Sequence, residues 1–185
     1  MKKNTTVLIF MLLLAVTGFS QTTSDFFKKS DSFFNTYVKN GGVAYSEIKS
    51  DPSSLNELIE MAKDISVDKG NANDYQAFWI NGYNLSVIKG IIDNYPIKSP
   101  LDVGGFFDNT KYDIGGTSIT LNDIENKLLR KNFPKEPRFH FVLVCGGLGC
   151  PPIINSAYMP STLDTQLEEQ TKLALNDPNF IRVNE

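Results

Sequence analysis

Hydrophobic residues dominate one long stretch near the middle of the chain, residues 75–95. Apolar side chains occupy nearly every helical position there, so the stretch lacks the polar face of a surface helix. Asn73 or Asp74 stands before it as a candidate N-cap, and Pro96 ends it because proline cannot continue a helix. The pattern therefore predicts a long buried helix at the centre of the fold. Its apolar members are Ala77, Phe78, Trp79, Ile80, Tyr83, Leu85, Val87, Ile88, Ile91 and Ile92.

Three further segments repeat apolar residues at helical spacing. They run from a cap at residues 23–25 to about Val38, from Leu55 to about Ile65, and from Leu121 to about Lys131. Each has one apolar face, so we expect these helices to pack around the central one. Residues 43–48, between the first two, form a short piece that we expect to be extended.

Two segments carry the pattern of β-structure. Residues 112–120 alternate around Gly115-Gly116, which is typical of a hairpin with a two-residue turn. Residues 139–145 form an apolar run in which alternation would turn His140 to one face and Cys145 to the other. The predicted fold class is α+β, with helices packed around a small, mainly antiparallel sheet that includes residues 139–145.

The first 20 residues predict an exported protein. Lys2 and Lys3 precede an unbroken apolar run, residues 7–16, and small residues follow before Gln21. This order is typical of a secretory signal peptide. A membrane anchor is the alternative, but the run is about half of the roughly 20 residues that span a bilayer. We expect a signal peptide over 1–20, one α+β domain over 21–185, a periplasmic or extracellular location, and no stable membrane anchor after cleavage.

The net charge of the chain limits the kinds of partner that we expect it to bind. Without Lys2 and Lys3 the chain has 16 basic and 21 acidic residues, a net charge of −5. Nucleic acid is not an expected partner, because phosphate binding depends on clustered lysine and arginine.

Both cysteines and the single histidine lie between His140 and Cys150. Cys145 is followed by Gly146, Gly147 and Gly149, whose backbone amides could stabilise a thiolate or an oxyanion. The same flexible segment also allows a Cys145–Cys150 disulfide in an oxidising compartment. Two cysteines and one histidine at no standard spacing do not make a zinc site, so we expect no metal and no cofactor. His140 is too far along the predicted strand to act as the base for Cys145.

Three polar residues are candidates to support Cys145. Asn81 and Asn84 share one face of the apolar central helix, so each needs hydrogen-bond partners or a ligand. They either tie the helix to loop backbone or orient a reacting group. Glu125 lies beside the apolar face of its helix; it either pairs with Arg130 at a boundary or serves as a base.

Four motifs in order resemble the domain of unknown function 547 family. They are Ala77-Phe-Trp-Ile-Asn81-Gly-Tyr-Asn84, Asn94-Tyr-Pro96, Asp123-Ile-Glu125, and His140-Phe to Cys145 with Leu148-Gly-Cys-Pro-Pro152. The resemblance covers about residues 43–185. It implies that Asn81, Asn84, Glu125 and Cys145 stand at positions that belong to the motifs of the family. Cys150 matches bacterial members but not plant ones. Bacterial members often carry histidine where this chain has Asn126, and similar proteins continue beyond the point equivalent to Glu185, so we expect a C-terminally truncated chain.

The family has no settled activity, so three functions stay open. The first is a binding module that holds a small molecule or peptide in a pocket around Cys145, lined by Trp79, Tyr83 and the three glycines. The second is a hydrolase or acyl transferase with Cys145 as nucleophile, the glycine amides as oxyanion donors, and Asn81, Asn84 or Glu125 as positioning groups. The third is a thiol-disulfide role for Cys145 and Cys150, which the lack of a C-x-x-C motif disfavours.

Overall fold

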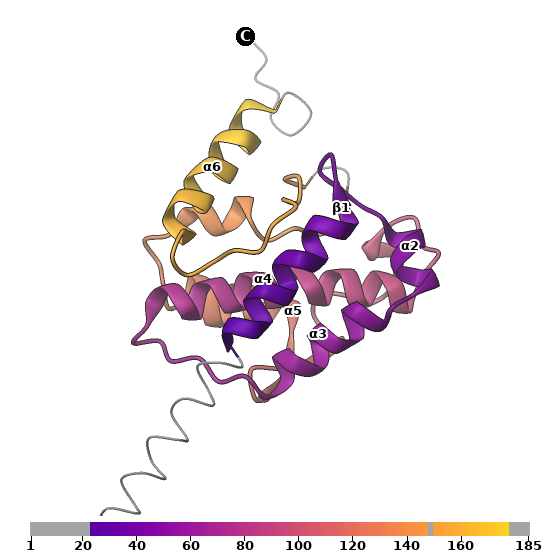
Figure 1. Ribbon diagram of the computed structural model, residues 1–185, viewed down its shortest axis with the longest axis horizontal. Coiled ribbons are helices and arrows are strands. Elements are labelled where there is room, and N and C mark those ends of the chain that lie inside the picture. The colour runs from indigo at the N-terminus through magenta and orange to yellow at the C-terminus, as the bar shows by residue number, and fades with distance from the viewer. Residues whose placement is uncertain (1–22, 148–149, 178–185) are drawn as a thin grey trace, which may run out of the picture.

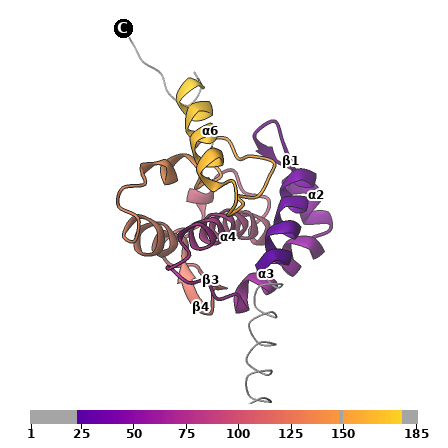
Figure 2. The ribbon, with the colours of Figure 1, turned by 60° about the vertical axis from the view of Figure 1, so that its left-hand side comes forward.

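The computed structural model describes residues 23–147 and 150–177. The predicted signal peptide, Gly149 and the end of the chain lie outside these residues. At the centre lies α4 (Ala72–Asp93), and Figure 2 shows the other elements arranged around it. Helix α4 is buried on all sides, including polar Asn81 and Asn84. The predicted buried central helix is therefore confirmed.

Three helices from the first third of the chain pack on one side of α4 (Figures 1 and 2). They are the N-terminal helix (residues 23–37), α2 (Tyr45–Ser50) and α3 (Ser53–Asp64). The first brings Phe26 against Phe78 of α4, with ring centroids 5.4 Å apart. Between the N-terminal helix and α2, the strands β1 (Val38–Lys39) and β2 (Gly42–Val43) form a short antiparallel pair.

The expectation of an extended segment over residues 43–48 was wrong beyond Val43. The Ala44 carbonyl accepts from the amides of Glu47 and Ile48, which starts α2. Helical spacing buries Ile48 completely, and α2 packs against α4. Lys49 then donates to the carbonyl of Ile92 near the end of α4 at 3.0 Å. In this helix Ile48 packs into the core while Lys49 reaches the end of α4.

The predicted hairpin is confirmed, and its turn also caps the C-terminal end of helix α3. Strands β3 (Lys111–Ile114) and β4 (Thr117–Thr120) pair antiparallel, and Gly115 and Gly116 have φ of 65° and 72°. Both values lie in the region that a two-residue hairpin turn needs and glycine adopts without strain. The amides of these two glycines donate to the carbonyls of Ala62 and Lys63, at 2.9 and 2.8 Å. The turn thereby satisfies carbonyls at the C-terminal end of α3 that no helical partner could reach.

The predicted helix over residues 121–131 is present, but most of it is wider than an α-helix. Thr120 caps α5 (Leu121–Asp123), which continues as the π-helix η2 (Ile124–Arg130). The amide of Lys131 donates to the carbonyl of Asn126, the five-residue separation of a π-helix. The buried side chains are Leu121, Ile124 and Leu129, and the helix packs against α4.

The strand expected over residues 139–145 was wrong. Residues Pro137–Phe141 form a 3-10 helix, η3, that Glu136 caps at the amide of Arg138. Val142 and Leu143 then donate back to the Phe139 carbonyl, so their amides are not directed toward a strand. Proline at the first position and the acidic cap favour a helical start, and they outweigh the apolar alternation. The described part of residues 142–162 contains no helix or strand.

The last described element, α6 (Leu163–Asn176), packs on η3. Arg138 links them, because its guanidinium pairs with Glu136 and, at 2.8 Å, with Asp164 of α6. A short 3-10 turn, η1 (Pro100–Asp102), follows α4. The fold class is α+β as predicted, although the strands of the described residues form two separate antiparallel pairs and the centre is a helix.

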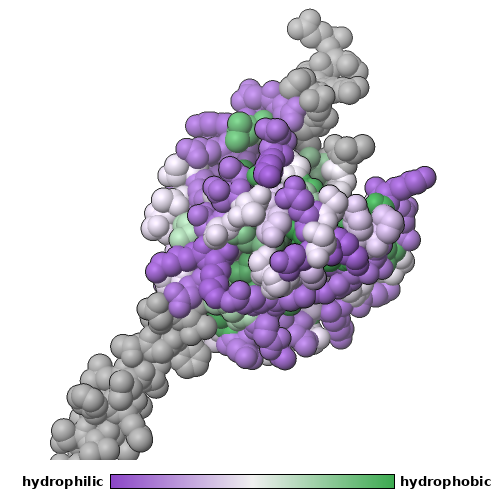
Figure 3. Space-filling model, turned by 45° about the vertical axis from the view of Figure 1, so that its right-hand side comes forward, coloured by the Kyte–Doolittle hydropathy of each residue, from purple (hydrophilic) through white to green (hydrophobic). Residues whose placement is uncertain are grey.

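The surface is mainly hydrophilic on the face shown in Figure 3, where hydrophobic residues appear only in small areas. Within the described ranges, no helix has the length and apolar character that crossing a bilayer requires.

Candidate functional site

Cys145 and Cys150 form a disulfide, with their Cα atoms 6.1 Å apart. Both residues are half-buried, and they close a small loop within the irregular segment that follows η3. The disulfide is the bond that the flexible glycine spacing allowed. In this state neither sulfur is a thiolate, so Cys145 is not available as a nucleophile.

The glycines of the loop take two different positions. Gly146 has φ of 73°, and a Cβ at that position would lie 2.8 Å from Ile91 of α4 and 3.3 Å from Pro100. Gly147 lies inside the loop, where a Cβ would be 3.7 and 3.8 Å from the two sulfurs, and its carbonyl accepts from the Cys150 amide. Gly146 thus seats the loop on α4, and Gly147 shapes its turn. Gly149 lies outside the described residues.

Asn84 connects α4 to the segment that leads into this loop. Its Nδ2 donates to the carbonyl of Val142 at 2.9 Å, and its Oδ1 accepts from the amide of Val144 at 3.0 Å. An amide side chain that donates and accepts in this way replaces a neighbouring strand as the partner of the backbone. Asn84 therefore binds the residue before Cys145, and both the nitrogen and the oxygen of its carboxamide already have backbone partners.

Asn81, one turn earlier, does the same for a later part of the segment. Its Nδ2 donates to the carbonyls of Tyr158 and Ala77, at 2.7 and 2.9 Å, and its Oδ1 accepts from the Tyr158 amide at 2.9 Å. The side chain is fully buried. These contacts favour the predicted role of tying the helix to loop backbone.

Three residues that the sequence analysis did not single out complete this support. Asp31 accepts from the Ala157 amide, and Gln166 accepts from the Met159 amide and donates to the Ala157 carbonyl. Gln170 donates to the Pro152 carbonyl at 2.5 Å. Gln166 and Gln170 lie four residues apart on α6, beside buried Leu163 and Leu167. Two glutamines on the apolar face of a helix are the sequence feature from which their role could have been predicted. Side-chain amides from α4 and α6 hold much of residues 142–162 in place.

Glu125 is engaged with Arg130, as one of the two interpretations expected. The guanidinium lies 2.8 Å from the carboxylate, and Arg130 Nε donates to it at 3.0 Å. Tyr83 of α4 lies near this pair. Burial raises the pKa of the Tyr83 phenol, the charge of Glu125 raises that pKa further, and Arg130 opposes both effects. Glu125, Arg130 and Tyr83 thus form one group, in which the carboxylate already has a cationic partner.

The remaining candidates are placed in the core or on the surface. Trp79 is buried and packs beneath the hairpin turn, where a Cβ on Gly115 would lie 2.5 Å from its ring. His140 is exposed on η3, with its ring against Phe141. It does not lie on one face of a strand as the alternation predicted, because the segment is not a strand. Among the described residues, no three histidine, cysteine, aspartate or glutamate side chains gather as metal ligands would.

The family model described as "Protein of unknown function, DUF547" matches residues 67–173. The chain belongs to this family. The match contains all four motifs on which the resemblance rested, although it is shorter than the expected span of residues 43–185. Neither the curated proteins nor the solved structures include a significant match to the chain.

Proposed function

We propose that this family member is a non-catalytic binding module that holds a small molecule or peptide at the loop closed by Cys145 and Cys150. The observation that supports this proposal is the disulfide itself, since it removes the thiolate that a cysteine-dependent hydrolase or acyl transferase needs. The other groups such an enzyme would use are also engaged: Asn81 and Asn84 with backbone, Glu125 with Arg130.

The loop has the properties of a preorganised binding surface. The disulfide fixes it across its base, Gly146 seats it on α4, and Gln170 holds the Pro152 carbonyl. Gly147 is exposed and both cysteines are half-buried, so the loop is reachable from solvent. A loop whose conformation is already fixed loses little conformational entropy on binding, which favours recognition.

Cys145 and Cys150 are only half-buried, which favours one second candidate, a thiol-disulfide role. A disulfide that a thiolate can reach can exchange with it through a mixed disulfide. In that reaction the attacking thiolate bonds to one cysteine sulfur, and the other leaves as a thiolate. The expected location is compatible with both roles, because export through a signal peptide over residues 1–20 leads to a compartment where disulfides persist.

The decisive experiment measures thiol reactivity and ester turnover on the same preparation. Without reductant, we expect no alkylation by iodoacetamide between pH 6 and 9 and no hydrolysis of p-nitrophenyl acetate. After reduction, we expect alkylation with the pH dependence of an ordinary thiol, whose pKa is about 8.5. Hydrolysis by the reduced protein that Cys145→Ser abolishes and Cys150→Ser retains would instead establish the thiol enzyme.

Binding is tested by thermal shift against panels of small molecules and short peptides, since a ligand that binds only the folded state raises the melting temperature. A ligand that shifts wild type but not the double variant Cys145→Ser/Cys150→Ser supports the loop as the site. Faster reduction of the Cys145–Cys150 bond by a thioredoxin-type dithiol than by glutathione, with no ligand found, would favour the thiol-disulfide role.

A further inference from the structure

The chain contains two Asn-Gly pairs, and the fold places them in opposite surroundings. Asn40-Gly41 forms the turn between β1 and β2, where both residues are exposed. Asn81-Gly82 lies inside α4, where both residues are buried. Asparagine is a thermolabile residue, and it rearranges most readily before glycine, because no Cβ there shields the backbone nitrogen that attacks its side chain. The two pairs therefore separate the effect of the fold from the effect of the sequence.

The turn between β1 and β2 leaves the reacting groups of Asn40 without partners. Lys39 pairs with Gly42 across the turn, so Asn40 and Gly41 are its two central residues. Their φ values are 54° and 75°, as a two-residue hairpin turn requires. Among the described residues, neither the Asn40 carboxamide nor the Gly41 amide has a hydrogen-bond partner. Both the atom that attacks and the group that is attacked are therefore free to react.

This turn can open locally, whereas α4 cannot. Strands β1 and β2 share only two residue pairs, and so short a two-stranded ladder is marginally stable. Opening lets Asn40 leave its left-handed conformation and bring its Cγ atom to the Gly41 nitrogen. Asn81 lacks this freedom, because its carboxamide is bonded to both backbone groups of Tyr158 and its helix is buried.

We propose that Asn40 is a site of spontaneous covalent modification, which converts it to isoaspartate and aspartate in the folded protein. The Gly41 nitrogen loses its proton to hydroxide and bonds to Cγ of Asn40, and the side-chain nitrogen takes up a proton and leaves as ammonia. Water then opens the five-membered succinimide at one of its two carbonyl groups. Opening at the backbone carbonyl gives isoaspartate, and opening at the side-chain carbonyl gives aspartate. Water and hydroxide are the only reagents.

The modification changes the surface next to the disulfide loop. A Cβ on Gly41 would lie 2.9 Å from Cβ of Pro152, so the turn lies against the segment that follows Cys150. Both products add a negative charge there, and isoaspartate also adds one carbon atom to the backbone of the turn. Because the register of a hairpin depends on the length of its turn, isoaspartate disturbs the pairing of β1 with β2. This chemistry does not depend on the binding function proposed above.

The test compares the two Asn-Gly pairs within one molecule. The folded, oxidised protein is incubated in mildly alkaline water enriched in oxygen-18 and returned to ordinary water. Trypsin then releases residues 40–49 and 70–89 as separate peptides for mass spectrometry. We expect labelled acid to accumulate at Asn40, and at Asn81 roughly a thousandfold or more slowly, because α4 opens only with global unfolding. Methylation by a protein isoaspartyl methyltransferase identifies the isoaspartate.

Two controls separate the fold from the sequence. In urea, Asn40 and Asn81 should convert at similar rates, since neither is then protected. Asn40→Gly removes the carboxamide but suits the left-handed turn, so residues 40–49 should stay unlabelled in that variant. An unlabelled Asn40 in the folded protein, after a time in which the urea sample converts fully, would overturn the proposal. Equal labelling of Asn40 and Asn81 in the folded protein would overturn it as well, because the fold would then select neither.

The variant Asn40→Asp separates the added charge from the added backbone atom. Aspartate tolerates the left-handed conformation, so this variant should keep the nuclear Overhauser contacts between Lys39 and Gly42. The isoaspartyl form, isolated by chromatography, should lose them. If both proteins keep these contacts equally, the extra atom does not open the turn and the predicted change of this surface is wrong.

Discussion

Asn81 and Tyr158 pair in both directions: the Asn81 carboxamide donates to the Tyr158 carbonyl and accepts from the Tyr158 amide. Replacement by leucine leaves both backbone groups of Tyr158 buried without these partners. We expect Asn81→Leu to lower the free energy of unfolding by roughly 1–3 kcal/mol, the cost of unsatisfied buried groups. Urea unfolding followed by circular dichroism measures the change, and Asn84→Leu should behave similarly through Val142 and Val144.

The control is Asn176→Leu on α6. Asn176 also donates to the carbonyl four residues earlier, at 2.7 Å, but it is exposed. Its replacement should change stability by less than about 0.5 kcal/mol. If Asn81→Leu and Asn84→Leu unfold like wild type but lose ligand binding or turnover, the two asparagines are functional groups and their structural interpretation is wrong.

Gly90 of α4 packs directly against Tyr112 of β3. A Cβ on Gly90 would lie 2.4 Å from the Tyr112 hydroxyl and 2.8 Å from the Phe106 ring, closer than real Cβ contacts. We expect Gly90→Ala to lower the free energy of unfolding by about 1–3 kcal/mol through overpacking, despite the higher helix propensity of alanine. Gly104→Ala is the control, since no atom lies within 4 Å of its Cβ. Equal unfolding midpoints in urea for the two variants would show that α4 and β3 are not this close.

The sequence pattern correctly predicted a helix that is apolar at almost every position and a hairpin whose turn residues are two glycines. Helix α4 is apolar at almost every position, and Gly115-Gly116 has the positive φ that its hairpin requires. The disulfide and the Glu125–Arg130 pair were also among the stated alternatives, because both depend on residues close in sequence.

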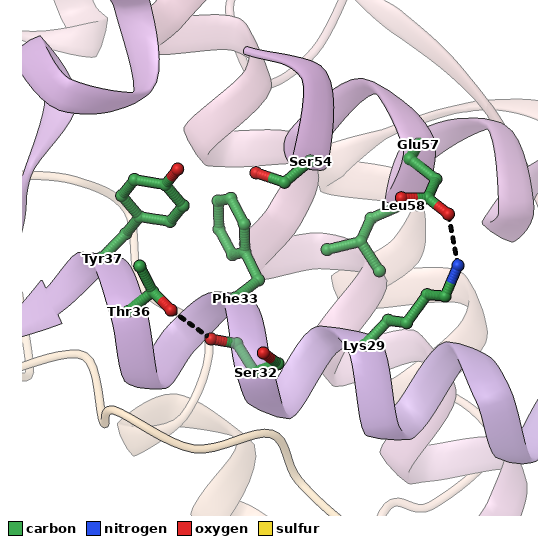
Figure 4. Close-up of a pocket in the computed structure, with 8 residues that line it drawn as sticks. All are labelled: Lys29, Ser32, Phe33, Thr36, Tyr37, Ser54, Glu57 and Leu58. Atoms are coloured by element: carbon green, nitrogen blue, oxygen red, sulfur yellow. Dashed lines mark hydrogen bonds and ion pairs between the residues drawn. The ribbon is translucent and has the colours of Figure 1, made fainter. Parts of the chain in front are cut away.

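Long-range partners were the part that the pattern could not supply. Residues 139–145 alternate like a strand, but nothing in the sequence shows that Asn84 satisfies the backbone of Val142 and Val144 in place of a neighbouring strand. The hollow between the N-terminal helix and α3 (Figure 4) could not be predicted for the same reason. Ser54 and Phe33 belong to helices predicted separately, and only their packing reveals the hollow between them.

Buried tyrosines should make the free energy of unfolding depend on pH in the alkaline range. Burial raises the pKa of Tyr112 to about 12, with a further contribution from the charge of Asp93, and burial raises the pKa of Tyr45 to about 12. The folded state then holds these protons more tightly than the unfolded state, where the pKa is about 10. The stabilisation is complete below pH 10 and is lost as the pH rises toward 12.

We therefore expect the free energy of unfolding to fall between pH 10 and 12. Tyrosinate absorbance and circular dichroism, measured on the same samples, should change together over that range. Tyr112→Phe should flatten the dependence, and it should cost little stability at pH 7, because the Tyr112 hydroxyl has no hydrogen-bond partner among the described residues. Full tyrosinate formation near pH 10 with the fold intact would contradict the assigned burial.

The Cys145–Cys150 disulfide closes a short loop, so its effect on global stability should be modest. The chain-entropy relation gives about 2 kcal/mol for a loop of this length. We expect reduction to lower the free energy of unfolding by about that amount while α4 and its partners stay folded, since Asn84 and Gly146 hold the loop by contacts that need no disulfide. The double variant Cys145→Ser/Cys150→Ser should match the reduced protein and show no further response to reductant. Urea unfolding with and without a phosphine reductant makes the comparison. Single variants that differ from each other by more than about 1 kcal/mol would show that one sulfur has a role in the fold beyond the bond it shares.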